Sequence, residues 1–445
     1  MSRQEEGLAM AEKMQKVVNP YRPGAGHKPP YLAGRAVYAE YFCKLLQQSF
    51  YTENLLITGL RGMGKTVLLD SLREVAIDSG WLWIGNDLSE SSTLSEDRIA
   101  LRLLTDISHS LTRWVEKNCD VHDAWADGTY RFSALRTMYE NTPGLPSDKL
   151  NAVLDRLNFV VRRTGIAGFV FAYDEAQCLR DHKHNHEYPM SMVIETISTL
   201  QRKDGGTPCL LVLSGLPQVH DALIETRTYT ERMFHVISLG RLSREETMEA
   251  ILNPLKHLIP PPQVTKELIN KTADLTGGYP YLVQFFGKEL VEALWANGGS
   301  LNSSGFPNSA VIERLDASLF ASRWNKTSEK QRLFLGYIAR RSPGTPDFSA
   351  QDILSAGAAD EGFTRAQANQ MMQALCERGL LYRSRHGRYR FTVPMSEMLI
   401  QRRQRADVEL TDFWLADSFA IRPTRADALR AAPSIDRRRG WNWFR

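Results

Sequence analysis

The fold of this chain is decided by the stretch Gly59-Leu60-Arg61-Gly62-Met63-Gly64-Lys65-Thr66, which matches the pattern GxxxxGK[ST]. Glycines at these positions allow positive φ angles and let backbone amides approach a phosphate closely. A helix that begins at Lys65 directs its positive N-terminal end toward the same anion. Lys65 can then bridge the β- and γ-phosphates of a nucleotide, and Thr66 can offer its hydroxyl to Mg²⁺. The stretch therefore predicts a phosphate-binding loop, the P-loop.

Short apolar runs on both sides of the P-loop have the length of buried strands. One of them directly precedes the loop, and the set covers residues 55–58, 81–84, 168–173, 210–214 and 235–239. Helical patterns separate these runs, at residues 36–50, 65–79 and 95–163. Strands that alternate with helices form a parallel sheet covered by helices on both faces. The sequence thus predicts an α/β fold built on a P-loop sheet.

Polar side chains stand where two of these strands end. Asp174 and Glu175 follow the run 168–173, and Ser214 closes the next run. Ligands of open α/β sheets bind at the carboxyl ends of the strands. We therefore expect Asp174 to hold the magnesium shell, Glu175 to orient and deprotonate the attacking water, and Ser214 to hydrogen-bond the γ-phosphate or that water. The alternatives are an ordinary acidic pair in a turn and a serine cap for the next helix.

After Leu239 the strand pattern stops and helices follow. Ser243 and Glu246 form a capping-box pattern. Helical patterns then cover residues 244–257, 265–275, 281–295 and 308–322, which predicts a small helical domain. From about residue 325, three capped helices precede two strand-like runs, at 380–383 and 389–393. Helix, helix, helix and hairpin is the order of a winged helix.

The third of these C-terminal helices, residues 365–378, has one apolar and one polar side. The residues expected inside are Ala368, Met371, Met372 and Leu375, and the polar side carries Arg365, Asn369, Gln370 and Gln373. The hairpin adds Arg383, Arg385, Arg388 and Arg390. A polar helix face that enters the major groove, with arginines on the phosphates beside it, predicts DNA binding. The alternative is a winged helix that docks on protein.

Charge is distributed unevenly along the chain. The formal net charge is +4, but residues 325–445 hold 21 basic and 13 acidic side chains, and residues 1–324 carry a net charge of −4. An acidic body with a basic C-terminal third favours a polyanionic partner at that end. The tail, residues 401–445, has ten arginines and no lysine, and it ends in RRRGWNWFR. It can stack bases, dock on a partner or pack on its own domain.

Three histidines alternate in one loop, at His182, His184 and His186. Three imidazoles can bind a transition metal. Alternation alone is a weak signal, so the preferred interpretation is a solvated polar loop, with a partner or DNA contact as a further alternative.

Composition narrows the class of protein. The five cysteines form no CxxC pair, which argues against a zinc ribbon and a disulfide scaffold and favours a reducing compartment. The N-terminal residues lack the apolar core of a secretory signal. The longest uncharged apolar run, near residues 168–173, is far shorter than the roughly 20 residues that cross a bilayer. We therefore expect a cytoplasmic protein without a membrane partner.

Together, the P-loop, the Asp174-Glu175 pair, the Ser214 strand end, the helical lid and the winged helix resemble an AAA+ ATPase. The resemblance is to the branch that contains origin-recognition initiators, transposition-helper ATPases and STAND signalling ATPases, and it covers about residues 17–400. It implies ATP and Mg²⁺ as ligands. It also implies nucleotide contacts from Arg35, Gly59, Arg61, Gly62, Met63, Gly64, Lys65, Thr66, Val67 and Pro280.

The same resemblance implies a division into domains. These are an N-terminal strap, an AAA+ core, a helical lid, a winged-helix domain and a basic aromatic tail. Their expected limits are residues 1–27, 28–240, 241–322, 323–400 and 401–445.

Further roles follow from the resemblance for residues outside the P-loop. Arg35 belongs to a stretch that resembles the Gly-Arg box lying along the adenine. Arg232 stands where the family carries an arginine finger, with Arg227 as a competitor and a structural salt bridge as the alternative. Pro280 lies in a stretch that resembles the STAND Gly-x-Pro motif, where initiators carry a sensor arginine. This departure favours a slow switch over fast turnover.

The expected activity is an ATP-dependent molecular switch. ATP hydrolysis by Glu175, aided by Arg232 of a neighbouring subunit, would change the lid and thereby DNA binding at the C-terminal end. The competing hypothesis is a STAND-like signalling or scaffold ATPase, in defence against mobile elements, whose C-terminal region binds protein. Two other hypotheses are a loader that recruits a nuclease, helicase or transposase, and a nucleotide-gated transcription regulator.

Overall fold

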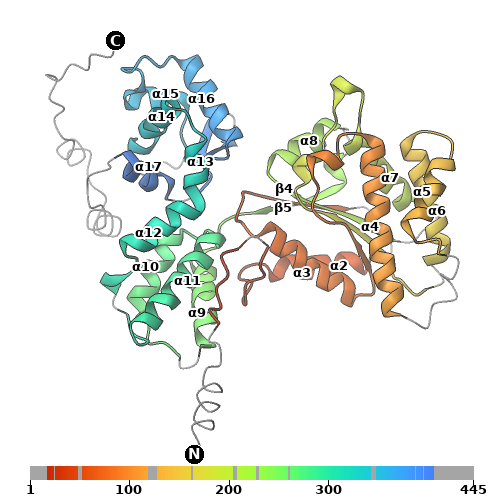
Figure 1. Ribbon diagram of the computed structural model, residues 1–445, viewed down its shortest axis with the longest axis horizontal. Coiled ribbons are helices and arrows are strands. Elements are labelled where there is room, and N and C mark those ends of the chain that lie inside the picture. Colours follow the sequence, from red (N-terminus) through yellow and green to blue (C-terminus); the bar gives the residue numbers. More distant parts are fainter. Residues whose placement is uncertain are drawn as a thin grey trace, which may run out of the picture. The chain divides into compact units, whose positions relative to one another are not determined.

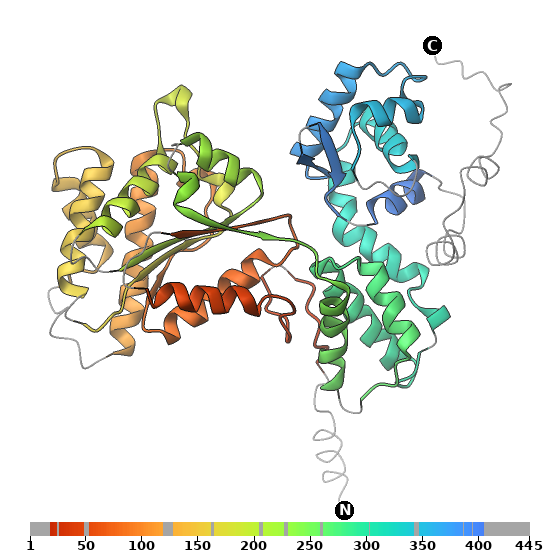
Figure 2. The same ribbon diagram turned by 180° about the vertical axis from the view of Figure 1, so that it is seen from behind.

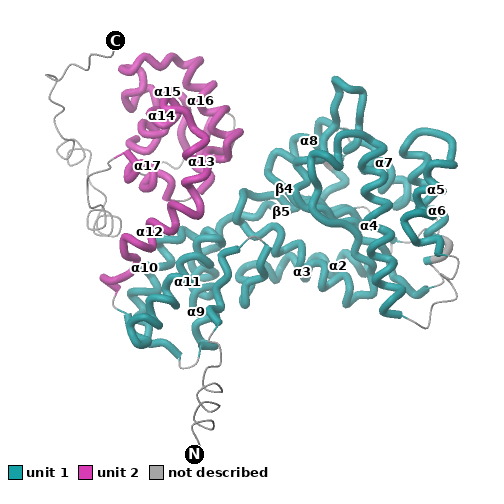
Figure 3. The backbone as a smooth tube through the Cα atoms, viewed as in Figure 1, with its two compact units in different colours: residues 1–301 teal, residues 302–445 magenta. Residues whose placement is uncertain are grey.

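The computed structural model describes residues 18–24, 26–48, 53–118, 128–161, 164–203, 208–226, 230–258, 261–301, 303–341, 347–385, 387–393 and 395–404. Two compact units divide the chain, residues 1–301 and residues 302–445 (Figure 3). Each unit buries its own set of apolar side chains. Across the described parts of the chain, no helix combines the length and the apolar character that a membrane crossing requires.

The first unit is built on a five-stranded parallel sheet in the order β2-β3-β4-β1-β5. The strands are β1 (Asn54–Gly59), β2 (Leu82–Ile84), β3 (Phe169–Tyr173), β4 (Cys209–Gly215) and β5 (Phe234–Leu239). Every residue of β1, β3 and β4 is buried, whereas half of the residues of the edge strand β5 are exposed. This pattern confirms the parallel sheet that the apolar runs predict.

Helices cover both faces of this sheet (Figures 1 and 2). The connection from β1 to β2 runs in the opposite direction to the later connections, and parallel crossovers are right-handed, so its helix lies on the opposite face. That face carries α2 (Ala36–Leu46) and α3 (Lys65–Asp78). The other face carries α4 (Glu96–Lys117), α7 (Pro189–Arg202) and α8 (Gln218–Thr226), and α5 (Phe132–Asn141) and α6 (Pro146–Val161) pack against α4.

A helical lid completes the first unit. It consists of α9 (Arg244–Lys256), α10 (Lys266–Thr276) and α11 (Pro280–Ala296), which pack against one another. Ser243 and Glu246 form the capping box that the sequence predicts at the start of α9. The strap lies against the lid, because the Asn19 side chain donates to the Lys288 carbonyl at 3.0 Å and the buried Tyr21 hydroxyl donates to the Ile251 carbonyl.

The second unit begins with a helix that the sequence analysis assigned to the lid. Residues 308–322 form α12 (Ser309–Leu315), a π-helical turn (Asp316–Phe320) and the start of α13 (Ala321–Asn325). The helix α17 (Ser396–Gln404) is bound to this segment, since the Arg403 guanidinium donates to both carboxylate oxygens of Asp316 at 3.0 and 2.6 Å. The other domain limits drawn from the sequence stay predictions.

The remainder of the second unit has the winged-helix order. It contains α14 (Glu329–Arg340), α15 (Ala350–Ile353), α16 (Arg365–Glu377) and the antiparallel pair β6 (Leu381–Arg385) and β7 (Arg388–Phe391). Each of the three helices starts with a capping box, as predicted. On α16 the expected apolar side is buried at Ala368, Met372 and Leu375, but Met371 is only half-buried. Its prediction was wrong because Met371 lies at the margin of the buried stripe.

Candidate functional site

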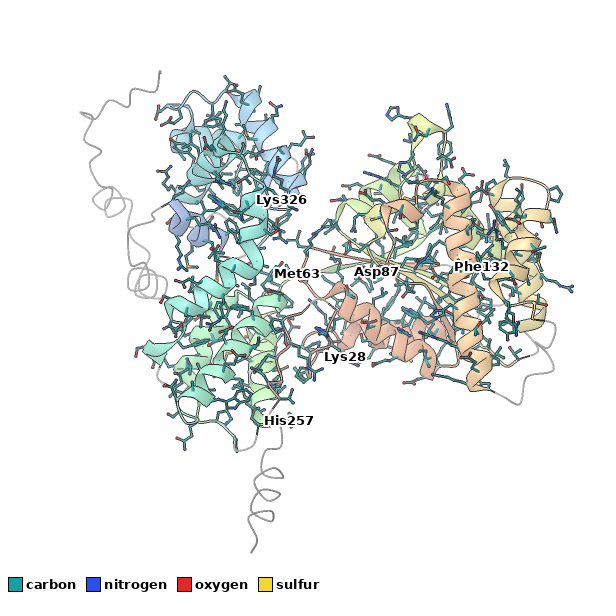
Figure 4. All side chains as sticks on the ribbon, in the orientation of Figure 1. Lys28, Met63, Asp87, Phe132, His257 and Lys326 are labelled. Carbon is teal, nitrogen blue, oxygen red and sulfur yellow. The ribbon has the colours of Figure 1, made fainter. Side chains whose placement is uncertain are left out.

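The P-loop connects the buried strand β1 to the helix α3 (Figure 4 labels Met63 in this loop). Gly62 and Gly64 have φ angles of 79° and 82°, which side chains other than glycine rarely adopt. Gly64 is the N-cap of α3, and no side chain caps the helix there. Uncapped amides at the start of a helix favour an anion. The loop therefore has the local structure of a phosphate site.

Lys65 and Thr66 point into the site from the first turn of α3. The Lys65 ammonium donates to the Leu60 carbonyl at 3.2 Å, across the mouth of the loop. Burial lowers the pKa of Lys65, and the charges of Asp174 and Glu175 oppose this effect. The Thr66 hydroxyl donates to a carboxylate oxygen of Asp174 at 2.5 Å. The structure thus brings the P-loop and the end of β3 together.

Asp174 is the centre of the hydrogen bonds at this end of the sheet. Besides Thr66, the Ser214 hydroxyl donates to its carboxylate at 2.7 Å and the Glu175 amide donates at 2.9 Å. The adjacent strands β3 and β4 pair Tyr173 with Leu213, so the next residue of each strand meets at the carboxyl edge. Both side chains are buried, and Ser214 is fully so. The γ-phosphate role of Ser214 stays a prediction, since its hydroxyl here donates to Asp174.

Glu175 lies beside Asp174 but is exposed to solvent. Its φ angle of 53° is left-handed, a strained conformation for a residue with a side chain, and such strain is concentrated at functional sites. The Gln177 side-chain amide donates to the Glu175 carboxylate, and its oxygen accepts from the Leu216 amide at 3.0 Å. Gln177 was missed by the sequence analysis, and its only signal is its place two residues after Glu175.

Two further carboxylates lie close to Asp174. Asp87, which Figure 4 labels, follows β2. Its backbone pairs with that of Asp174 through an isolated bridge. Burial and then the charge of Asp174 raise its pKa. Asp70, one turn into α3, has its pKa raised by burial and also by Asp174 and Asp87, against a lowering effect of Arg73. Neither residue stands in a sequence motif, so neither was predicted from the sequence.

Arg35 lies between the P-loop and the connection to the lid. It is 7% exposed, and its guanidinium donates to the Gly240 carbonyl at 3.0 Å and to the Met63 carbonyl at 3.5 Å. Burial lowers its pKa, and the charges of Tyr38 and Glu246 oppose this. The Arg35 guanidinium therefore lies beside the loop, where it donates to two backbone carbonyls. Its predicted place along an adenine is untested.

The lid reaches the P-loop through the stretch around Pro280. Pro280 is the first residue of α11, and Tyr279 is its N-cap. The Tyr279 hydroxyl donates to the Arg61 carbonyl, and the Tyr281 amide donates to the Gly62 carbonyl at 3.2 Å. The structure therefore brings the Pro280 stretch to the loop. The contact made by Tyr279 was not predicted from the sequence.

Arg232 lies at the other end of the sheet. It ends a 3₁₀ turn, Thr230–Arg232, just before β5, and its side chain is exposed. β5 runs parallel to β1, so Arg232 is at the amino edge while the P-loop is at the carboxyl edge. A six-residue strand separates these edges by about 20 Å. Arg232 therefore does not belong to the site of its own subunit, and Arg227 lies outside the described residues.

The histidine loop shows no metal-binding arrangement. The His182 ring lies 3.2 Å from the Thr93 carbonyl, whereas His184 and His186 are exposed. The acids of this loop act as caps: Asp181 accepts from the Ser191 amide at 3.0 Å, and Glu187 accepts from the Glu96 amide at 2.9 Å. Within the described residues, no group of three or more His, Cys, Asp or Glu side chains could hold a metal ion.

The residues predicted to contact DNA lie on the polar side of α16 and in the hairpin. The expected outer residues of α16 are exposed, namely Arg365, Asn369, Gln370 and Gln373. In the hairpin Arg383 is exposed. Arg388 pairs with Asp352 at 2.7 Å, and Arg390 donates to both oxygens of Asp347. The side chain of Arg385 and the tail beyond Gln404 lie outside the described residues. Two of the predicted DNA-contacting arginines are therefore neutralised by acids of the same unit.

The strand order, the P-loop, the lid and the winged helix together define an AAA+ fold. The chain is similar to the ORC2 protein of Aeropyrum pernix, solved in ADPNP and ADP complexes, with a TM-score of 0.53 and 15% identity over 90% of this chain and 98% of that one. It is also similar to the Walker-type ATPase PABY2304 of Pyrococcus abyssi, with a TM-score of 0.54 and 17% identity over 83% of this chain and 96% of that one.

Comparison by sequence reaches only the C-terminal part of the chain. A family described as a domain of unknown function (DUF8462) matches residues 317–398, which include the winged helix. No curated protein matches the chain. At the identities of the two solved structures, the likeness establishes the fold, and the chemistry must be argued from the side chains of this chain.

Proposed function

We propose that this chain binds ATP with Mg²⁺ at the P-loop and hydrolyses it slowly, as a molecular switch whose C-terminal winged helix binds DNA. The observation that carries the proposal is the Asp174 cluster, in which a buried carboxylate accepts from Thr66 of the P-loop and from Ser214 of β4. A phosphate loop, a hydroxyl and a carboxylate at one sheet edge are the parts that phosphoryl transfer needs. The nucleotides in the similar ORC2 structure support the same ligand class.

The side chains present fit a hard cation. Mg²⁺ prefers oxygen ligands and is held by a few hydroxyl or carboxylate groups beside substrate phosphates. Thr66 and Asp174 offer such oxygens, 2.5 Å apart, next to the loop. They would hold the ion, which when bound neutralises charge on the phosphate oxygens. The amides of the P-loop and the Lys65 ammonium would hold the phosphate chain itself.

Glu175 would act as the base. In the proposed reaction, its carboxylate accepts a proton from a water whose oxygen bonds to the γ-phosphorus. The bond from that phosphorus to the β,γ-bridging oxygen breaks, and ADP and inorganic phosphate leave. Gln177 already donates to this carboxylate, which agrees with slow turnover because the base must be released first. Arg232, remote from its own site, would act in the site of a neighbouring subunit.

The test is ATP hydrolysis by the wild type, Glu175→Gln and a surface control, Glu225→Gln, in which an exposed glutamate of α8 is changed. We expect Glu175→Gln to bind ATP normally and to lose roughly 10²- to 10⁴-fold in rate. The control should hydrolyse ATP like the wild type. Undiminished hydrolysis by Glu175→Gln would remove its role as the base, and absence of ATP binding by the wild type would refute the proposal.

DNA binding is supported by the exposed polar side of α16. Removing one phosphate contact should reduce the slope of log affinity against log salt by about 0.9. Anisotropy titrations with duplex DNA should therefore show a shallower slope for Arg365→Ala than for the wild type, and no change for Arg156→Ala, an exposed arginine of α6. A wild type without salt-dependent DNA binding would refute this half of the proposal.

A second candidate function is supported by the pairing in the hairpin. Arg388 and Arg390 are engaged by Asp352 and Asp347, which lowers the charge available to a phosphate backbone. This favours a signalling or scaffold ATPase whose winged helix binds protein. The DNA titration separates the two candidates, because only the first requires a salt-dependent affinity for duplex DNA.

A further inference from the structure

Four carbonyl groups of the P-loop receive hydrogen bonds from several parts of the first unit. The Leu60 carbonyl accepts from the Lys65 ammonium, and the Met63 carbonyl accepts from Arg35. The two carbonyls between them, of Arg61 and Gly62, accept from the lid. A loop that turns amides toward an anion leaves carbonyls on its outer side, and each needs a donor. The lid supplies two of these donors.

Tyr279 is built rigidly into the lid. It is 1% exposed and forms the N-cap of α11, and its amide donates to the Thr276 carbonyl at 3.0 Å. The preceding Gly278 has a φ angle of 72°, and its carbonyl accepts from the Leu242 amide at 2.7 Å. A Cβ atom on Gly278 would lie 2.2 Å from the Leu242 carbonyl oxygen. The backbone around Tyr279 therefore leaves its ring little freedom to move without the lid.

Gly62 permits this approach of the lid to the loop. A Cβ atom at Gly62 would lie 3.0 Å from the ring and the hydroxyl of Tyr279 and 3.1 Å from the Cβ of Tyr281. By contrast, a Cβ atom at Gly64 would meet nothing within 4 Å. Of these two glycines, only Gly62 lies in close contact with the lid.

We propose that Tyr279 is a positioning residue that couples the lid to the phosphate loop. The carbonyl of Arg61 and the amide of Gly62 belong to one planar trans peptide, so they point in opposite directions. By holding the carbonyl toward the lid, the Tyr279 hydroxyl turns the Gly62 amide toward the side where the proposed function places phosphate. The inference rests on that proposed function. It adds a physical reason why docking of the lid and binding of the nucleotide should affect each other.

Such a coupling between two sites is reciprocal. Phosphate that binds the oriented amide favours the docked lid, and the docked lid favours phosphate. Removing the hydroxyl removes one neutral hydrogen bond, which corresponds to an affinity loss of about 2- to 12-fold. A purely structural role would instead reduce the fraction of active protein and leave the affinity of the remainder unchanged.

The experiment compares the wild type, Tyr279→Phe and Tyr281→Phe in the full chain. Tyr281 is a matched control, because its contact with the loop uses the backbone amide and survives the substitution. Calorimetric titration with MgADP should show the 2- to 12-fold loss for Tyr279→Phe only. For hydrolysis we expect a raised KM with kcat within about twofold, since the lost bond acts on binding.

A second measurement does not depend on nucleotide. Hydrogen exchange without ligand should be faster in Tyr279→Phe in both the loop, residues 59–68, and the lid segment, residues 277–285. Unchanged exchange together with unchanged MgADP affinity would overturn this inference, as would an equal loss in Tyr281→Phe. Absence of MgADP binding by the wild type would instead overturn the proposed function, with the exchange result still deciding the coupling.

Discussion

Two glycines of the P-loop offer a matched perturbation. Gly62 and Gly64 have nearly equal φ angles, 79° and 82°, so alanine is strained at both. Their surroundings differ, because a Cβ atom at Gly62 would crowd Tyr279 and Tyr281 of the lid, whereas one at Gly64 would meet no atom within 4 Å. Gly64→Ala therefore measures backbone strain, and Gly62→Ala measures backbone strain plus displacement of the lid.

The magnitudes follow from these two causes. A left-handed conformation costs alanine roughly 1–2 kcal/mol. At Gly62 the added methyl group is tighter than ordinary contact by a few tenths of an ångström, and overpacking of this kind costs roughly 1–3 kcal/mol more. We expect the free energy of local opening to fall by roughly 1–2 kcal/mol for Gly64→Ala and by roughly 2–5 kcal/mol for Gly62→Ala.

Hydrogen exchange without nucleotide is the suitable assay, because it reports local opening free energies in separate segments. In Gly64→Ala the faster exchange should be confined to residues 59–68. In Gly62→Ala it should extend to residues 277–285, since the lid must give way. Residues 329–340 of the second unit serve as an internal reference that neither substitution should change. Equal effects of the two substitutions, or a lid segment unaffected by Gly62→Ala, would refute the reasoning.

Two other predictions concern the core and the strap. Burial raises the pKa of Asp106 in the folded protein, although Arg102 lowers it. The contribution of this carboxyl group to folding stability is therefore greatest below its unfolded pKa of about 3.9, and it is lost as the pH rises through the folded pKa. Urea midpoints from about pH 4 to about pH 7 should therefore fall in the wild type relative to Asp106→Asn, and parallel midpoints would contradict this sign. A Cβ atom on Gly287 would lie 2.3 Å from the Tyr21 ring, so Gly287→Ala should release the strap and speed chymotryptic cleavage after Tyr21, since trypsin does not cleave the Arg22-Pro23 bond. Gly240→Ala, where a Cβ atom meets nothing within 4 Å, is the control, and equal cleavage in the two variants would contradict the docking of the strap.

Much of the fold was predictable because its signals are local. The GxxxxGK[ST] stretch, the apolar strand runs and the capping boxes each lie within a few residues of one another. Their physical causes, positive φ, burial and orphan amides at helix starts, act at the same short range. The predictions that were wrong concern features that depend on tertiary packing. Met371 is only half-buried, and a π-helical turn interrupts the helix predicted at 308–322.

The site was predictable only in part for the same reason. Strand ends supplied Asp174, Glu175 and Ser214, since parallel strands bring their carboxyl ends to one edge. The partners of these residues carried no signal in the sequence. Gln177 matters because its amide reaches Glu175 and the turn after β4 together. The sequence predicted that Arg388 and Arg390 contact DNA phosphates. In the folded protein they form ion pairs with Asp352 and Asp347.

The sequence by itself determined that a phosphate loop, a carboxylate pair, a lid and a winged helix occur in this order. The tertiary structure alone decided what holds that loop in shape. Tyr279 and Arg61 are 218 positions apart, and no periodic pattern links them. Their hydrogen bond exists because positive φ angles at Gly62 and Gly278 let two backbones approach closely. Such a contact depends on how folded segments pack, which is a property of the whole unit.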